Sequence, residues 1–174
     1  MYSLVRSEEL WDKDQLFIIF EIKKAMNFYQ ILKSAHSGWR YIVFALLVIA
    51  VINALSGWLG KKTYTEGNRK LNVFTLISAH IQLLFGLGLY FVSPLTKIAS
   101  SEPIGRYWKM EHISMMILAI ILITIGNSKS KKVTDAVAKH KAVAIFFSLA
   151  LVIIVGAIFM MVKADPSRTF FGVS

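Results

Sequence analysis

Four long apolar runs constrain this chain more than any other feature of its sequence. A helix needs about 20 apolar residues to cross the roughly 30 Å hydrocarbon layer of a bilayer. Three runs have about that length, and the shorter one needs Trp108–His112 and Gly126–Ser128 to complete a crossing. The sequence therefore predicts four membrane-spanning segments, centred on Tyr41–Leu59, Val73–Val92, Ile113–Ile125 and Ala142–Val162.

The fold class follows from these runs and from the connectors between them. The runs are continuous and do not alternate between apolar and polar residues, so a transmembrane barrel is excluded and helices remain. The connectors are short and polar, which makes neighbouring helices antiparallel. We expect an all-α, integral membrane, up-down four-helix bundle, with helices at about 34–59, 73–92, 108–128 and 142–162.

Composition agrees with a membrane protein and excludes several functions. Hydrophobic residues make up 56% of the 174 residues, whereas soluble domains have about 45–50%. The net charge of +10 lies between the apolar runs, and no nucleic-acid-reading module accompanies it, so nucleic acid is not an expected partner. The chain has no cysteine, which excludes disulfides, thiolate metal sites and cysteine catalysis.

The two ends of the chain differ from the bundle. Residues 1–25 mix charges with one short apolar stretch, LFIIF, and lack the pattern of a signal peptide. We expect them to form an appendage that lies on the membrane surface or is disordered. The transmembrane domain is expected at 26–163 and a short tail at 164–174.

The distribution of basic residues predicts the orientation. The connectors 60–72 and 126–141 carry nine Lys and Arg residues, against seven on the other side counted from Met26. Because cytoplasmic loops carry the excess of positive charge, both termini are expected outside the cytoplasm.

Each apolar segment also carries one histidine, and ionisable groups in membrane spans usually mark function. His140 lies between two lysines and is expected in headgroup water. His80 is expected about 13 Å inside the second helix, deeper than the others, where it could instead only hydrogen-bond to Asn53. His36 and His112 are expected at the outer ends of two parallel helices, at matching depth.

Cations accompany this outer pair. Arg40 follows His36 by one helical turn, and Arg106 and Lys109 precede His112. A b-type haem needs two axial imidazoles from different helices, an apolar slot, and cations for its propionates. We therefore expect His36 and His112 as axial ligands of haem iron, with His80 as a further candidate, and the three cations as propionate partners. Zinc or copper at the same histidines lacks an evident third ligand.

Three stretches also carry a resemblance: SAHSGWRY, SAHIQLLFGLGLYF and MEHISMMILAIILITIGNSKSK. Over residues 26–162 the chain resembles small bacterial four-helix membrane proteins labelled cytochrome b-like. The resemblance implies haem b (protohaem) in the bundle, axial histidines at His36, His80 and His112, and a place in the bacterial inner membrane.

Three functions remain open. The first is electron transfer through haem b, exchanging electrons with quinol or a partner redox protein. The second is a non-enzymatic integral subunit or assembly factor, in which the histidines only bond helices together. The third is transport of a small solute, proton or metal ion along His80, Gln82 and Asn53. An electron carrier or redox subunit is expected rather than a stand-alone enzyme, because no activated nucleophile, HExxH or GxSxG is present.

Overall fold

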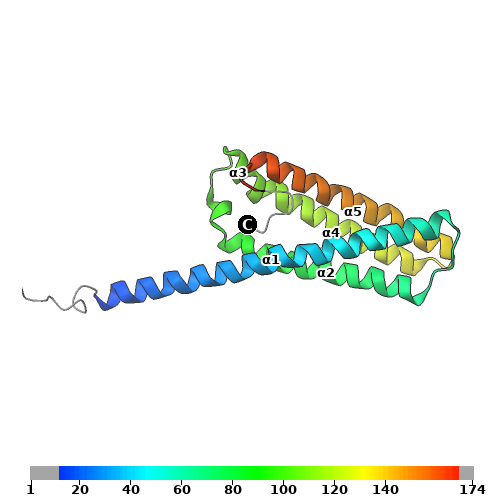
Figure 1. Ribbon diagram of the computed structural model, residues 1–174, viewed down its shortest axis with the longest axis horizontal. Helices are drawn as coiled ribbons and strands as arrows, with labels where there is room; N and C mark the ends of the chain where they lie inside the picture. The colour runs from blue at the N-terminus through cyan, green and yellow to red at the C-terminus, as the bar shows by residue number, and fades with distance from the viewer. Residues whose placement is uncertain (1–11, 169–174) are drawn as a thin grey trace, which may run out of the picture.

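The structure, a computed structural model, describes residues 12–168 and is built there from helices and short connectors (Figure 1). Four helices of this part are long and apolar enough to cross a membrane, which makes the protein a multi-pass membrane protein. The expected all-α four-helix bundle is confirmed. Its helices are α1 (Lys13–Leu59), α2 (Glu66–Val92), α4 (His112–Lys132) and α5 (Ala136–Ala164).

Three short elements connect α2 to α4. They are the 3₁₀ helix η1 (Pro94–Lys97), the single turn α3 (Pro103–Arg106) and the π-helical turn η2 (Tyr107–Glu111). The helical segment that crosses the membrane therefore runs without interruption from Pro103 to Lys132.

The four helices form a closed ring. α1 packs against α2 and α5, and α4 packs against the same two helices, so that α1 and α4 are diagonal to each other. Short connectors make each neighbouring pair antiparallel, and α1 and α4 therefore run parallel. The α2–α4 pair packs more loosely than the other three.

The bundle interior is filled mostly by aliphatic and small side chains together with Phe147 and Tyr107, and many large apolar side chains lie on the outside. Leu47, Ala79, Ile123 and Phe147 are buried, and they come from four different helices. On the outside lie side chains such as Leu84, which is 67% exposed. A soluble protein does not leave apolar surface of this extent open to water, so this outer surface faces lipid.

The first helix begins much earlier than the apolar run predicts. α1 starts at Lys13, and its first part extends past the end of the bundle without a helix beside it (Figure 1). Residues 13–25, expected as a surface-lying or disordered appendage, are helical and continuous with the first span; 1–11 lie outside the described residues. The reason is local: no Gly or Pro occurs between Lys13 and Ser37, so nothing in the sequence ends the helix there.

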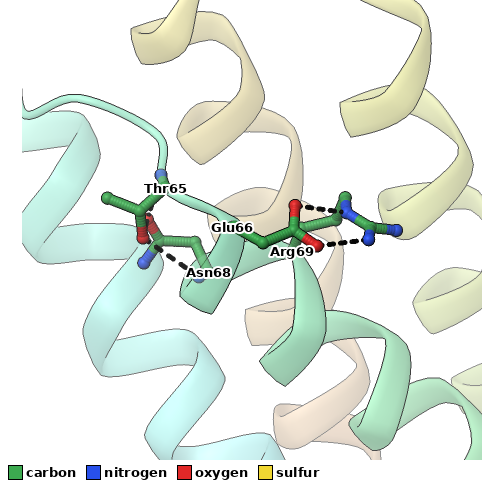
Figure 2. Close-up of polar contacts among 4 residues, drawn as sticks. All are labelled: Thr65, Glu66, Asn68 and Arg69. Atoms are coloured by element: carbon green, nitrogen blue, oxygen red, sulfur yellow. Dashed lines mark hydrogen bonds and ion pairs between the residues drawn. The ribbon is translucent and has the colours of Figure 1, made fainter.

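Polar caps explain why other helices also begin before their apolar runs. Thr65 and Asn68 form a reciprocal capping box, in which the Thr65 hydroxyl accepts from the Asn68 N–H at 3.3 Å (Figure 2). Glu66 and Arg69 add an ion pair on the next face. The first turn of α5 is capped in a similar way by Asp135, which accepts from the Ala138 N–H at 2.6 Å. These caps lie in the polar connectors, where hydropathy alone gives no signal.

A turn after α5 closes the described part of the chain. The Ser167 hydroxyl donates to Asp165 at 2.5 Å, and Arg168 forms an ion pair with the same carboxylate at 2.8 Å. The hydrogen bond from Ser167 and then the Arg168 guanidinium lower the pKa of Asp165. The rest of the expected tail, 169–174, lies outside the described residues.

Close packing of α4 on α5 can be tested at a glycine. A Cβ on Gly126 would lie 2.8 Å from Phe146 Cβ, whereas a Cβ on Gly156 would meet nothing within 4 Å. We expect Gly126→Ala to destabilise the bundle by about 1–3 kcal/mol through overpacking. Gly156→Ala should be neutral or stabilise by roughly 0.5–1 kcal/mol, because alanine favours the helix. Thermal unfolding followed by circular dichroism measures both, and equal effects of the two substitutions would contradict the packing.

Candidate functional site

Two of the expected site residues meet inside the bundle. His36 on α1 and His112 at the start of α4 face each other across the diagonal. Their ring centroids are 6.3 Å apart, and the ring planes are inclined at 73°. Both imidazoles are partly buried. Two parallel helices thus present a pair of imidazoles to the same interior point.

The separation of the two rings is informative about what could lie between them. Imidazole nitrogen binds a metal ion at about 2 Å, so two rings on opposite sides of one ion have centroids about 6 Å apart, and roughly 5 Å at a tetrahedral angle. The observed 6.3 Å agrees with the opposed arrangement. Among residues 12–168, no group of three or more His, Cys, Asp or Glu side chains could hold a metal ion. A metal ion between the two rings would therefore have only two protein ligands of these types.

Hydrogen bonds determine which nitrogen of His112 carries the proton. The Tyr107 hydroxyl donates to the Ala157 carbonyl of α5 at 2.8 Å, and the same oxygen lies 3.3 Å from His112 Nδ1. Since the hydroxyl has only one hydrogen, Nδ1–H must be the donor in the second contact. Neutral His112 therefore keeps a lone pair on Nε2, as a metal-ligating imidazole requires.

The π-helical turn η2 makes this contact possible. Residues five apart lie on different faces of a regular α-helix, but the turn from Tyr107 to Glu111 brings Tyr107 beside His112, with ring centroids 5.7 Å apart. Such turns are rare and often occur at functional sites. Sequence reasoning missed Tyr107, because it began the third helix at Trp108 and considered only neighbours at regular helical spacing.

Gln82 of α2 holds His36. Its amide nitrogen donates to the His36 carbonyl at 2.9 Å and lies 3.2 Å from His36 Nδ1. Gly86 leaves room for the ring, since a Cβ there would lie 3.2 Å from His36 Cε1. With the amide in this orientation, Nδ1 accepts and Nε2 carries the proton. Sequence reasoning had considered Gln82 only for a transport path, although a buried amide in a span must find a partner.

Two polar atoms near this pair have no hydrogen-bond partner in the described part of the chain. They are Gln82 Oε1 and Trp108 Nε1, and both are buried. The Trp108 ring lies 5.2 Å from His112. Buried polar atoms are normally satisfied, so each exception needs an explanation. If the Gln82 amide turned, Oε1 could accept from Nδ1–H of His36 and leave its Nε2 free to bind a metal. The turned amide would give up its hydrogen bond to the His36 carbonyl.

His36 is not at the mouth of its helix, as the apolar run suggested. Because α1 continues to Lys13, Leu32 lies against Gly88 and Trp39 donates to the Ser78 carbonyl at 3.0 Å. The His36 ring lies against Gly86, six residues from His80 on α2. His80 is therefore deeper in the bundle than His36, as expected, by roughly 6–9 Å.

His80 is nevertheless separate from the pair, because it lies on another face. Its side chain is exposed and lines a groove between α2 and α4, and its Nδ1 hydrogen-bonds to the Leu76 carbonyl at 2.8 Å. The alternative bond to Asn53 is also wrong, since Asn53 accepts from Asn68. Gln82, His80 and Asn53 thus bond to different partners, which gives no support to a common transport path.

His140 lies at the opposite end of the bundle and is buried, at 2% exposed, so the expectation of headgroup water is wrong. The connector before α2 covers it: His140 Nε2 is 3.3 Å from the Thr63 carbonyl, and its ring contacts Tyr64 with centroids 5.0 Å apart. Gly57 provides the space, because a Cβ there would lie 2.4 Å from the ring.

Of the three expected cations, Arg40 lies on α1 with His36, and Arg106 and Lys109 lie on α3 and η2, which precede α4. Arg40 donates to the Tyr41 hydroxyl at 2.9 Å, and Arg106 forms an ion pair with Glu111 at 2.8 Å. Lys109 is partly buried in η2. All three therefore lie near the His36–His112 pair in the chain, and Arg106 already has a carboxylate partner.

No protein-family model matches the chain, and no curated protein or solved structure matches it significantly. The fold and the site therefore define only a class: a multi-pass four-helix membrane protein with two opposed histidines at one end of its interior.

The role of Tyr107 can be tested by removing its hydroxyl. In Tyr107→Phe, His112 Nδ1 loses its acceptor, and we expect a mixture of tautomers in place of protonation at Nδ1 alone. Loss of the hydroxyl should also destabilise the bundle by about 0.6–2 kcal/mol. Nitrogen-15 NMR of labelled histidine reads the tautomer on protein without a bound metal, because a metal on Nε2 would keep the proton on Nδ1 in either protein. Tyr64→Phe is the control, because it removes a hydroxyl that binds Asn72 at the other end. A proton found on Nε2 of His112 in the unmodified protein would contradict the assignment.

Proposed function

We propose that the protein binds haem b between His36 and His112 and transfers electrons in the membrane. The observation that carries the proposal is the 6.3 Å separation of two imidazoles on diagonal, parallel helices. A haem iron takes two axial ligands from the protein and four from the porphyrin. The proposal is therefore consistent with the lack of a third protein ligand among the described residues.

The surrounding side chains fit this role. Tyr107 and Ala157 hold His112 with its Nε2 lone pair available. Gln82 would hold His36 through Nδ1–H once its unpaired Oε1 faces that nitrogen, in exchange for its present bond to the His36 carbonyl. Arg40, Arg106 and Lys109 would neutralise the propionates, for which an Arg fork is well suited. The haem supplies one-electron redox chemistry, and quinol or a partner redox protein would supply or accept the electron.

One observation favours a second candidate, an integral subunit or assembly factor without haem. In the present orientation of Gln82, His36 offers Nε2–H as a donor and His112 offers Nε2 as an acceptor. The two rings are then complementary and could tie α1 to α4 by a hydrogen bond. Such a bond in a membrane contributes only about 0.6–2 kcal/mol. This candidate therefore gives the pair a modest role in the stability of the bundle, but it does not explain why two histidines are used for that role.

Haem content separates the two candidates. Protein purified in detergent from haem-replete cells should show a Soret band that shifts and sharpens on reduction, and haem b in a pyridine extract. His36→Ala and His112→Ala should each lose the low-spin spectrum, because each removes an iron ligand. His80→Ala and His140→Ala are the matched histidine controls and should keep it, since their rings lie in the α2–α4 groove and at the opposite end.

Arg40→Ala refines this test. Loss of one charge-assisted hydrogen bond should weaken haem binding about tenfold, with the spectrum preserved. A colourless protein that regains no haem on reconstitution would exclude electron transfer and leave the subunit candidate. Haem loss in His80→Ala with retention in His36→Ala would place the iron elsewhere.

The orientation proposed for the chain is that both termini lie outside the cytoplasm, in a bacterial inner membrane. It rests on the basic connectors at the end that carries His140. Reporter fusions after Lys62 or Lys132 should report the cytoplasm, and a fusion after Val173 the other side. The reverse pattern would invert the protein and put the His36–His112 pair near the cytoplasmic face.

A further inference from the structure

A groove opens to lipid between α2 and α4, where the bundle is most loosely packed. It has a volume of about 270 Å³ and is lined by His80, Leu83, Ile117, Ile121 and Thr124, among others. Its walls are aliphatic except for one imidazole and one hydroxyl. The size is just below the roughly 300–1,000 Å³ of small-molecule sites, which suits a single substituted ring better than a whole lipid.

His80 is in an unusual position for an ionisable side chain. It lies near the middle of α2, about 20 Å of helix from either end, and is exposed at the surface that faces hydrocarbon. Its Nδ1–H is used by the Leu76 carbonyl, so in neutral His80 the second nitrogen, Nε2, is an acceptor that points away from the helix. Lipid chains have no donor for it, and an unsatisfied polar group in hydrocarbon is costly.

The Thr124 hydroxyl in the groove is likewise an acceptor without a free hydrogen. Thr124 donates its hydrogen to the Ile120 carbonyl at 2.8 Å, which leaves lone pairs on its oxygen. The polar groups of the groove are thus two acceptors whose own hydrogens are already used within their helices. A ligand for this groove should be an apolar ring that carries hydroxyl donors.

We infer that the α2–α4 groove binds the ring of a lipid-soluble quinol, with one hydroxyl donating to His80 Nε2. This inference rests on the proposed electron-transfer function and names its membrane partner. It also sets a preference: a quinone carries carbonyl acceptors, so it cannot pair with these two acceptors, and the reduced ring binds more tightly.

The groove is close to the paired histidines. His80 and Gln82 are two residues apart on α2, about 3 Å along the helix axis. His80 faces the groove, whereas Gln82 contacts His36 inside the bundle. The groove and the proposed haem site are thus on neighbouring faces of α2, which is a suitable arrangement for electron exchange.

The experiment measures binding to the whole chain in lipid nanodiscs by titration calorimetry without oxygen, with empty discs subtracted. Any bound haem is reduced beforehand for the titrations with duroquinol and its ether, and oxidised for the titration with duroquinone, so that no electron transfer adds to the heat of binding. The ligands are duroquinol, duroquinone and the dimethyl ether of duroquinol, which has the same ring without hydroxyl donors. The variants are His80→Leu, His80→Gln, which keeps an acceptor, and Phe74→Leu, an exposed residue of α2 outside the groove. Haem content is measured on every preparation.

We expect duroquinol to bind at least about fivefold more tightly than the other two ligands, the effect of one hydrogen bond. His80→Leu should abolish this preference, while His80→Gln keeps part of it, Phe74→Leu keeps all of it, and the haem content stays unchanged. Equal binding of duroquinol and its ether, or an unchanged preference in His80→Leu, would overturn the inference and leave the groove to lipid chains. The calorimetric readout does not need haem, so a haem-free protein would refute the proposed function while the preference for duroquinol is still measured.

Discussion

One layer of polar contacts near the end of the bundle holds all four helices in place. Gln82 ties α2 to the His36 carbonyl of α1, and Tyr107 ties the segment before α4 to the Ala157 carbonyl of α5. The rings of His36 and His112 bring the diagonal helices α1 and α4 together. Because hydrocarbon offers no hydrogen-bond partners, each of these groups must be satisfied inside the protein. The layer therefore fixes the positions of the four helices relative to one another along the bundle axis. The apolar side chains then fill the space between the helices.

A second polar layer closes the other end and is built on a different principle. His140 is buried beneath Thr63 and Tyr64. Its ring fits against α1 because Gly57 has no side chain there. Here the connector supplies the partners, whereas at the His36–His112 end the partners come from the helices themselves. Between the two layers the buried side chains are mostly aliphatic, with Phe147, Thr75 and Ser78 among them. The burial of His140 is thus explained by its packing against the connector.

The number of helices, their membrane character and their antiparallel order could be read from the sequence, because length and continuity of apolar runs decide these properties. The pairing of His36 with His112 also followed from parallel helices and similar depth. The ends of the helices could not be predicted from the apolar runs. The caps at Thr65 and Asp135 lie in polar connectors. In α1, no Gly or Pro separates the expected start at Ser34 from Lys13, where the helix begins.

The hydrogen-bond partners of the paired histidines could not be predicted from the sequence for a related reason. Gln82 lies 46 positions from His36, so only the tertiary structure brings it there, and Tyr107 reaches His112 through a π turn that regular helical spacing does not anticipate. For His80, hydropathy gave the approximate depth in the helix but not the face of α2 on which it lies.

Electron paramagnetic resonance of the oxidised protein tests the central claim most directly, because it reports the relative orientation of the two axial imidazoles. Planes inclined at 73° are close to perpendicular, which leaves the iron d orbitals nearly degenerate. The account predicts a strongly anisotropic low-spin ferric signal with one large g value, lost in both His36→Ala and His112→Ala. A rhombic low-spin signal typical of coplanar imidazoles, or no ferric haem signal at all, would contradict the opposed histidine pair as the haem site.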